Sequence, residues 1–449
     1  MRTLKFKHKI AWGTGEIGIA IYVGITMGFF PFYLTEAHHI SAATAGWILL
    51  IPRLWDGITD PVMGAISDRT RSRAGRRRPY LLVGSLLYGA TFWLFLAIPA
   101  AVTQTQTIVY LVAAYMLAST AMTIFDVPYS SMSAEMTTDY RERINLAGYK
   151  MVAARLGILI AGGIGPFLYM SGTDLLEGFA FMGAVFGLIM CVSGLITFFG
   201  TKDAPRFEQP ASKFSFKKEF HSLISNGPFR ILFSTFLFQN IAIGASATML
   251  VYFLTFAMQM DGRYIGPLYI ASGITATLVT PLWVKFSARM DKKTAYTIGL
   301  SIAIFLSLPG FFLPPGLFWV LIFLYAMIAI GDAANQLFPT SMAPDAVEVD
   351  QAKTGERREG TIFGAMAFCR KIGMAFGAFL ALRILDASGF LGGGIPFDEQ
   401  PENAILGVRI AYSLLPFTLW GIALIILRKY SLSESEFKRI QLNITDQQT

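Results

Sequence analysis

Residues 51–61 read Ile-Pro-Arg-Leu-Trp-Asp-Gly-Ile-Thr-Asp-Pro and place two carboxylates, Asp56 and Asp60, inside an otherwise apolar stretch. Their four-residue spacing puts both acids on the same face of a helix. A carboxylate at the depth of a membrane is costly and is usually kept there because it has a function. The stretch therefore predicts a membrane helix that carries a polar site.

The composition of the whole chain agrees with a membrane protein. Of its 449 residues, 54% are hydrophobic and only 15% are charged, whereas soluble chains average about 25% charged residues. Twelve apolar runs are long enough to cross a hydrocarbon layer about 30 Å thick. These runs lie near 10–34, 43–66, 80–100, 106–128, 146–170, 178–200, 229–258, 264–287, 294–313, 316–340, 361–385 and 404–428. We therefore expect an all-α membrane protein with twelve transmembrane helices.

Lysine and arginine are concentrated in alternate connections between these runs. The connections at 67–79, 137–150, 201–228, 285–293 and 341–360 are rich in them, and the intervening connections carry almost none. Because cytoplasmic connections collect positive charge, the alternation predicts that both termini are cytoplasmic. Membrane topology thus accounts for the net charge of +8, and a lipid bilayer rather than nucleic acid is the expected partner.

The long polar segment 201–228 divides the runs into six and six. We expect an N-terminal bundle over 1–200, a cytoplasmic linker over 201–228, a C-terminal bundle over 229–428 and a cytoplasmic tail over 429–449. Two six-helix bundles with a polar site near the midplane are typical of secondary transporters. The expected location is a plasma membrane, the inner membrane of a bacterium, and the expected state is a monomer.

Asp56 and Asp60 are the candidate ligands of a coupling cation. If this cation is sodium, the two acids are the expected metal ligands. Carboxylate oxygens suit a hard cation or a proton, and two close carboxylates resist joint ionisation unless a positive charge lies between them. Thr123 could add a hydroxyl oxygen, and Pro61 frees a backbone carbonyl. The alternative interpretation is that these acids pair with Arg53 or another base for packing alone.

Other polar residues in the apolar runs are candidate substrate contacts. Asp126 could accept hydrogen bonds from a substrate or complete the ion site. Lys371, about ten residues into the run 361–385, needs a counter-ion, and an acid of the opposite half could supply it in a conformational switch. Glu16 could line the cavity and Tyr129 could stack on a substrate ring, although interhelical packing explains each about as well.

The arginine-dense segment 64–79 is a topology signal and a candidate gate. Positive charge on a cytoplasmic connection explains its arginines but does not explain Asp68. Asp68 can pair with a basic residue of an adjoining cytoplasmic end when that side of the protein is shut. Arg69 and the pair Arg141 and Arg143 are the further candidates for this gate.

Several of these stretches together resemble the glycoside–pentoside–hexuronide:cation symporter family, the melibiose-permease branch of the major facilitator superfamily. The matching stretches are Arg53-Leu-Trp-Asp56-Gly-Ile-Thr-Asp60-Pro-Val-Met-Gly64, Thr70-Arg-Ser-Arg-Ala-Gly-Arg-Arg-Arg-Pro79, Asp126-Val-Pro-Tyr129, Arg141-Glu-Arg143, and Lys353-Thr-Gly-Glu-Arg-Arg-Glu-Gly360 with Lys371. They span nearly the whole chain, and none of them is specific for one substrate. The resemblance implies the major facilitator fold and transport by alternating access.

The resemblance also implies roles for single residues. Asp56, Asp60 and Thr123 match the cation-site positions of the family. Asp126 matches a sugar-binding acid, and Lys371 matches the functional lysine of the eleventh span.

The chain departs from the family pattern at other site positions. Thr59 stands where the family has an asparagine that influences the choice of cation. Lys150 or Met151 lies near the position of a family arginine. Ala20 and Ser130 replace a sugar-binding aspartate and a stacking tryptophan. The departures leave sodium and proton coupling both open and do not support a galactoside.

The sequence therefore predicts a symporter coupled to sodium or protons, with a glycoside, pentoside or hexuronide as its small-molecule substrate. The alternative is a transporter of a lysolipid or another amphiphilic solute on the same fold. A membrane enzyme or sensor is not favoured, because the sequence shows no clustered nucleophile, metal motif or soluble signalling domain. No cofactor is expected apart from the coupling ion.

Overall fold

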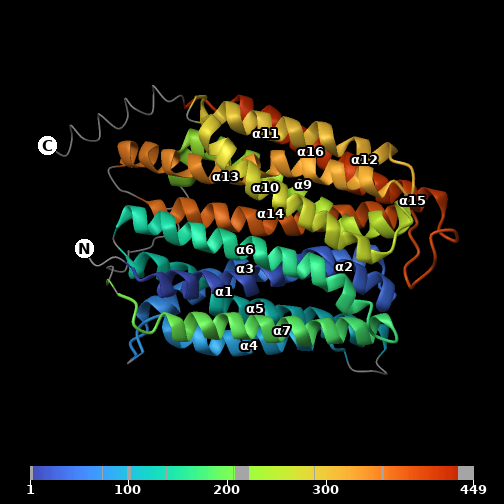
Figure 1. Cartoon of the computed structure of the whole chain (residues 1–449), viewed down its shortest axis with the longest axis horizontal. Coiled ribbons are helices and arrows are strands. Elements are labelled where there is room, and N and C mark those ends of the chain that lie inside the picture. The colour runs from blue at the N-terminus through green and yellow to red at the C-terminus, as the bar shows by residue number, and fades with distance from the viewer. Residues whose placement is uncertain are drawn as a thin grey trace. The chain divides into compact units, whose positions relative to one another are not determined.

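The computed structural model describes residues 4–72, 74–98, 103–137, 139–205, 207, 222–287, 289–354 and 358–432, and all regular elements in that part of the chain are helical (Figure 1). The described residues fall into two compact units. Unit 1 comprises those within Met1–Ser212, Asp261–Tyr269 and Leu391–Glu399. Unit 2 comprises those within Lys213–Met260, Ile270–Phe390 and Gln400–Thr449.

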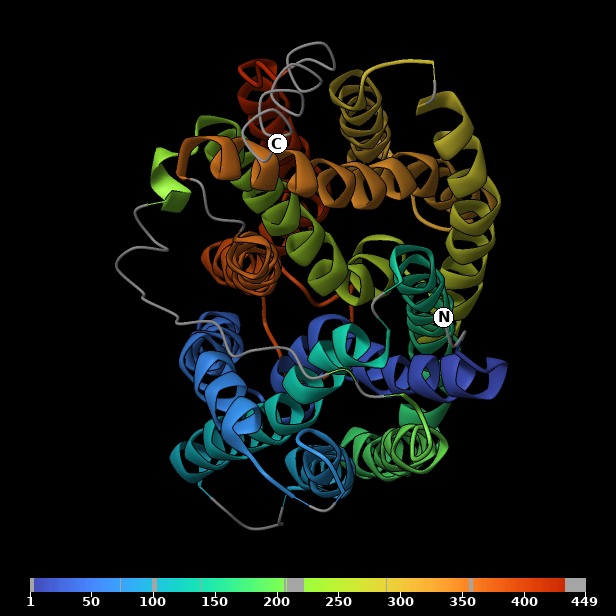
Figure 2. The same ribbon diagram turned by 90° about the vertical axis from the view of Figure 1, so that its left-hand side faces the viewer.

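Unit 1 is a bundle of long helices that run side by side (Figures 1 and 2). In it, α1 packs against α6 and α7, α4 packs against α5 and α7, and α3 packs against α5. A short helix and a π-helical turn extend the end of α1. The elements are α1 (Phe6–Gly28), α2 (Phe30–Phe32), η1 (Tyr33–Ala37), α3 (Ala42–Arg69), α4 (Arg78–Leu96), α5 (Gln104–Met136), α6 (Tyr140–Tyr169), α7 (Leu175–Gly200) and the 3₁₀ turn η3 (Gly262–Tyr264).

Unit 2 is a second helical bundle. In it, α9 packs against α14 and α16, and α11 packs against α13 and α16. Its elements are α9 (Gly227–Tyr252), η2 (Phe253–Ala257), α10 (Ile265–Ser287, whose first residues belong to unit 1), α11 (Lys292–Ser307), α12 (Pro309–Phe312), α13 (Phe318–Thr354), α14 (Glu359–Ala387), α15 (Glu402–Arg409), η4 (Ile410–Leu414) and α16 (Leu415–Arg428).

The helices have the length and composition of membrane spans. Among the described residues, eleven helical segments are long and apolar enough to cross a membrane. Large apolar side chains such as Leu278, Phe305 and Trp319 remain at least 67% exposed on the protein. A lipid layer removes such side chains from water, so their exposure fits a bilayer. The predicted all-helical, multi-pass membrane protein is confirmed.

The helix α3 corresponds to the predicted run 43–66 but falls outside these eleven segments. It is 28 residues long, which is enough to span the hydrocarbon layer. Arg53, Asp56 and Asp60 lower its mean hydropathy, as the sequence already showed. The residues that make α3 functionally interesting are thus the residues that weaken its membrane signal.

Several helices are longer than the predicted apolar runs, because polar residues continue the helix until a capping side chain ends it. The run 106–128 lies within α5, whose first turn is closed by a capping box between Thr103 and Gln106. Asp139 and Asp174 accept backbone N–H groups at the starts of α6 and α7. Capping side chains satisfy N–H groups that the helix itself leaves unpaired. Hydropathy marks the membrane depth of a helix, and caps mark its ends.

Close packing of α9 against α14 depends on small residues. A Cβ atom at Gly377 of α14 would overlap the carbonyl oxygen of Ile241 on α9. A Cβ atom at Gly244 of α9 would overlap the carbonyl oxygen of Met374 on α14. Small residues let helix backbones approach closely in membranes, where dispersion contacts drive association. These glycines therefore fix the distance between the two helices.

Candidate functional site

A buried ion pair holds Asp56 on α3. Arg53 Nη1 lies 3.2 Å from Asp56 Oδ2, and the two side chains are 6% and 4% exposed. Ser119 Oγ of α5 donates a hydrogen bond to the other carboxylate oxygen, Asp56 Oδ1. Both oxygens of Asp56 therefore already have donors, and one of these donors carries a full positive charge.

The guanidinium of Arg53 is itself surrounded by partners from other helices. Its Nη2 donates to Thr26 Oγ1 of α1 over 3.2 Å. Its central carbon lies 5.4 Å from the Tyr22 ring centroid and 5.8 Å from that of Tyr115. Aromatic faces attract cations at such distances. In this conformation Arg53 occupies the place of a cation beside Asp56, as the packing interpretation of the sequence anticipated.

Asp60, one turn further along α3, has different surroundings. Thr123 Oγ1 of α5 donates to Asp60 Oδ1 over 2.8 Å. Thr123 is buried and Asp60 is half-buried. The structure thus joins two of the predicted cation ligands through packing of α3 on α5, and it pairs Asp60 with a neutral hydroxyl group. Asp60 and Thr123 stay the predicted first ligands of a cation, because both oxygens of Asp56 already have donors.

The hydroxyl group of Thr59 bonds its own helix rather than Asp60 or Thr123. Its hydroxyl donates to the Trp55 carbonyl oxygen of its own helix over 3.3 Å. Trp55 in turn donates from Nε1 to Thr120 Oγ1 of α5 over 2.9 Å. A role of Thr59 in the choice of cation stays a prediction.

A second polar cluster connects three helices of unit 1. Lys150 Nζ on α6 lies 3.3 Å from Glu16 Oε2 on α1 and donates to Ser130 Oγ on α5 over 3.1 Å. Ser130 donates to Asp126 Oδ1, one turn earlier on α5, over 3.0 Å. Glu16, Asp126 and Lys150, which the sequence marked separately as substrate contacts, therefore form one chain of interactions through Ser130. We call these four residues the polar cluster.

Tyr129 contacts the polar cluster through Lys150. Its side chain is 0% exposed. Its ring stacks on Trp12 with centroids 5.1 Å apart and on Phe125 with centroids 5.5 Å apart. Lys150 Nζ lies 5.1 Å from its ring centroid. In this conformation Tyr129 stacks on protein side chains and positions Lys150, and it presents no open face to a substrate ring.

Lys371 lies half-buried on α14 in unit 2. Asp126 and the other residues of the polar cluster belong to unit 1. An ion pair between Lys371 and an acid of the other half stays a prediction.

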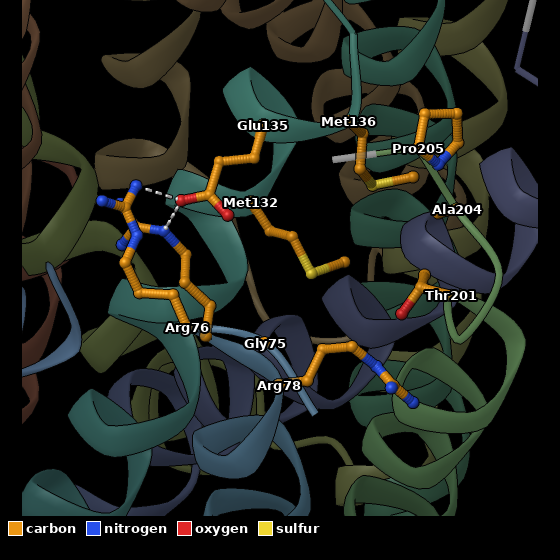
Figure 3. Close-up of a pocket in the computed structure, with 10 residues that line it drawn as sticks. Gly75, Arg76, Arg78, Met132, Glu135, Met136, Thr201, Ala204 and Pro205 are labelled. Carbon is orange, nitrogen blue, oxygen red and sulfur yellow. Dashed lines mark hydrogen bonds and ion pairs between the residues drawn. The ribbon is translucent and has the colours of Figure 1, made fainter. Parts of the chain in front are cut away.

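The candidate gate contains an ion-pair cluster around Glu135, near the end of α5 (Figure 3). Arg76 Nη2 and Arg77 Nε lie 2.5 Å and 2.6 Å from Glu135 Oε1. Arg77 Nη2 also lies 2.7 Å from Asp68 Oδ1. Asp68 therefore pairs with Arg77. Arg76, Arg77 and Glu135 were not among the single residues predicted for the gate. Arg76 and Arg77 belong to the arginine-dense segment 64–79, which was already a candidate gate. Glu135 could have been found as an acid that follows the apolar run 106–128.

Two other expected gate residues, Arg69 and Arg143, are not part of the ion pairs around Glu135 and Arg77. Arg69 is exposed at the end of α3. Arg143 Nε donates to the Thr137 carbonyl oxygen over 3.1 Å. The side chain of Arg141 lies outside the described residues.

A small pocket lies at the same end of unit 1, away from Asp60 and the polar cluster. Figure 3 shows its lining side chains, with Arg78 pointing away from Glu135. Arg78 donates to the Phe198 carbonyl oxygen over 2.7 Å, and its guanidinium carbon lies 4.5 Å from the Phe198 ring centroid. The lining residues are Gly75, Arg76, Arg77, Arg78, Met132, Glu135, Met136, Thr201, Ala204 and Pro205. This pocket belongs to the candidate gate rather than to the candidate ligand site.

Comparisons with known proteins agree with a transporter. The profile of the family described as "MFS/sugar transport protein" matches residues 11–434. The "Putative glycoside/cation symporter YagG" of Escherichia coli (strain K12) is 28% identical to this chain, with 98% of this chain and 95% of the relative covered. The "Sodium-dependent lysophosphatidylcholine symporter 1-A" of Danio rerio is 27% identical, with 99% and 89% covered.

A solved structure shares the fold. The inward-facing, unoccupied form of a bacterial homologue of the human lysosomal transporter Spinster aligns with a TM-score of 0.65. The alignment covers 98% of this chain and 96% of the other, at 15% sequence identity. An identity this low speaks for the fold alone.

Proposed function

This chain belongs to the MFS/sugar transport protein family, and from that membership we propose that it is a symporter that couples a small polar solute to a sodium ion or a proton. It is a transporter and not an enzyme. The expected substrate is a glycoside, a pentoside or a hexuronide, moved by alternating access between the two sides of the membrane.

The observation that carries this proposal is the order of polar groups along α5. Thr123, which bonds Asp60, and Asp126, which belongs to the polar cluster, are three residues apart and lie on neighbouring positions of one helix face. A cation held by Asp60 and Thr123 is therefore adjacent to the group that would bind the substrate. Adjacent sites allow each ligand to change the affinity for the other, as symport requires.

Asp60 and Thr123 make the first contacts with the cation in this scheme. Asp56 joins them only when Arg53 releases it, because its two oxygens already have donors. The release of Arg53 would then form part of the conformational cycle. Such a step ties cation binding to a movement of α3 against α1 and α5, the helices that supply Thr26 and Ser119.

The polar cluster offers what a sugar needs. Glu16 and Asp126 are acceptors, Lys150 is a donor, and Ser130 can be either. Sugar hydroxyls both donate and accept, so a mixed set can hold them at several points. Lys371 of unit 2 remains a candidate substrate contact.

The topology completes the scheme. We take α3 as a twelfth span beside the eleven apolar helices, with both termini in the cytoplasm. The ion pairs of Asp68, Arg77 and Glu135 then lie on the cytoplasmic side and act as a gate that opens when these pairs break.

Transport by the purified protein in proteoliposomes tests this function. We expect one member of a panel of glycosides, pentosides and hexuronides to accumulate when either a sodium gradient or a pH gradient is imposed. Asp60→Asn should abolish accumulation against a gradient and preserve exchange of substrate across the membrane. Asp203→Asn changes an exposed acid in the same way and should leave accumulation unchanged. Accumulation by Asp60→Asn against a gradient would refute the coupling role.

A lysolipid is the second candidate substrate, because a relative of nearly the same extent is named as a sodium-dependent lysophosphatidylcholine symporter. The same proteoliposomes can be offered a fluorescent lysophosphatidylcholine beside the sugars. Sodium-dependent movement of this lipid without any sugar uptake would favour the second candidate over the first.

A further inference from the structure

The connection between α14 and α15 contributes a glycine-rich segment to unit 1. Both helices belong to unit 2, whereas Leu391–Glu399 belongs to unit 1. The segment begins Leu391-Gly-Gly-Gly-Ile395, and we call residues 391–395 the docking loop. The loop is covalently continuous with α14 and α15.

Two consecutive backbone amides of the docking loop bind the turn after α1. Gly393 N donates to the Thr35 carbonyl oxygen over 3.0 Å. Gly394 N donates to Glu36 Oε2 over 3.0 Å. Thr35 Oγ1 donates to the other carboxyl oxygen, Glu36 Oε1, over 2.9 Å. One carboxyl group thus connects the loop to η1.

The glycines of the docking loop are required for this approach. Gly393 and Gly394 have φ angles of +94° and +76°, a region that other residues rarely adopt. A Cβ atom at Gly392 would lie 2.6 Å from the Thr35 carbonyl oxygen, and one at Gly393 would overlap the His39 ring. The loop therefore has the backbone geometry and the small size that docking on Thr35 and Glu36 demands.

Glu36 lies in unusual surroundings for an acid. Its side chain is 4% exposed. Burial raises the pKa of Glu36 to about 7, against the smaller opposing effects of the hydrogen bonds from Gly394 and Thr35. Burial also lowers the pKa of His38 to about 4, so this neighbour is neutral at pH 7. Near neutral pH, Glu36 is therefore divided between its protonated and ionised forms.

Neighbouring charges do not compensate Glu36 within the described part of the chain. η1 packs against α2, α3 and α7. No charged side chain contributes to the pKa shift of Glu36 there; burial and two hydrogen bonds account for it. The nearby acids and histidines are few. Asp174 and Glu177 lie at the start of α7, His38 and His39 follow η1, and Asp398 and Glu399 lie in the segment Leu391–Glu399.

We propose that the docking loop is a proton-operated latch, which binds Thr35 and Glu36 when the Glu36 carboxyl is protonated and is released when that carboxyl is ionised. A protonated carboxyl still accepts from the Gly394 amide with its carbonyl oxygen. Its O–H can donate to the Thr35 hydroxyl oxygen, which reverses the direction of the bond between Thr35 and Glu36 Oε1. An ionised carboxylate is favoured by water, which it reaches when the loop leaves.

The direction of the pH dependence follows from the raised pKa. A released, exposed Glu36 titrates near 4.5, and the docked one titrates near 7. Docking is therefore strongest below about pH 4.5 and weakens as the pH rises through 7. Each pKa unit is a tenfold change in the docking equilibrium, so the full change is on the order of a hundredfold.

Hydrogen–deuterium exchange on the full-length protein in lipid nanodiscs measures docking directly. The readout is the exchange of a peptide covering 389–397 between pH 5.5 and 8.5, corrected for the intrinsic pH dependence of amide exchange. We expect the Gly393 and Gly394 amides to be protected at low pH and to lose protection as the pH rises through 7. The Gly389 amide, which bonds the Asp386 carbonyl oxygen in the same chain segment, is the internal reference.

Three variants distinguish the effect of protonating Glu36 from the effect of its hydrogen bonds. Glu36→Gln keeps both hydrogen bonds without a charge and should be protected at every pH. Glu36→Ala should be unprotected at every pH. Glu177→Gln removes an exposed acid of α7 that binds Thr173 and should behave as the wild type does. A wild-type loop whose protection does not vary with pH overturns the proposal, and so does a Glu36→Gln loop that exchanges as fast as Glu36→Ala. These outcomes do not depend on the transported solute.

Discussion

At the scale of single residues, Arg53 and Asp56 form a buried ion pair between two positions about one helical turn apart. Each ion loses water on burial, and their mutual attraction with the hydrogen bonds from Ser119 and to Thr26 offsets that loss. Removing one partner leaves an uncompensated buried charge, whereas removing both leaves none. The pair therefore couples the stability of α3 to the charge of one side chain.

A double-mutant cycle tests this pair. We expect Arg53→Met and Asp56→Leu each to lower the free energy of unfolding by about 3–5 kcal/mol, and the double variant to regain most of that loss. Unfolding in detergent solution measures all three. Arg263→Met, which breaks an exposed pair with Asp261, should cost about 1 kcal/mol or less. A double variant as unstable as the sum of the single variants would show that the pair does not act as a unit.

At the scale of helices, the units depend on contacts that small residues allow. The backbones of α9 and α14 meet where Gly244 and Gly377 carry no side chain. Neither backbone can move away without disturbing the rest of unit 2, because α9 also packs against α16. Membrane helices gain little from apolar burial relative to lipid, so this shape complementarity is a main source of their association.

Adding one methyl group should measure that complementarity. Gly377→Ala places a Cβ atom against the Ile241 carbonyl, and we expect it to destabilise the protein by about 1–3 kcal/mol. Gly421→Ala on α16 meets nothing within 4 Å and should be neutral or slightly stabilising. Thermal unfolding of the two purified variants compares them. Equal midpoints would mean that α9 and α14 can separate without cost.

At the scale of the whole molecule, orientation in the membrane decides which face each site serves. In the proposed topology, with both termini cytoplasmic, the ion pairs of Asp68, Arg77 and Glu135 lie on the cytoplasmic side and the docking loop lies on the other side. The proposed latch would therefore respond to the pH outside the cell. The proposed gate would respond to events in the cytoplasm.

Single cysteines can establish this orientation. In a background where Cys191 and Cys369 are replaced, Ser171→Cys should react with a membrane-impermeant maleimide in intact cells. Asp203→Cys should react only after the cells are opened. Both positions are exposed on the protein, so they differ only in the side of the membrane. Labelling in the reverse order would invert the topology and the sides assigned to gate and latch.

The sequence anticipated the helical membrane fold and the transporter family because both depend on signals that are local in the chain. Apolar runs report membrane depth, and Asp56, Asp60 and Asp126 stand out against them. The pairing of Thr123 with Asp60 was also expected, since the family resemblance aligned both residues with one site. The structure shows a hydrogen bond between these two side chains, and their role as cation ligands stays a prediction.

The partners of the other charged residues could not be obtained from the sequence. Arg53 was named as one possible base for Asp56, but only packing of α1 and α5 around it shows that both oxygens of Asp56 are taken. Tyr129 was a candidate for stacking on a substrate ring or for packing, and in this structure its ring stacks on Trp12 and Phe125. Which face of a helix meets which neighbour depends on residues of other helices, which lie 27 positions away for Thr26 and Arg53 and 117 positions away for Trp12 and Tyr129.

The sequence by itself determined that this chain is a helical membrane protein, because the hydrophobic effect acts on composition within each run of about twenty residues. It indicated transport through short stretches, such as residues 53–64, that resemble a symporter family. The tertiary structure alone decided that Ser130 joins Asp126 to Lys150 and that Glu36 meets the amide of Gly394. Glu36 and Gly394 are 358 positions apart. Hydrogen bonds act over about 3 Å, so only the folded chain can bring such groups together.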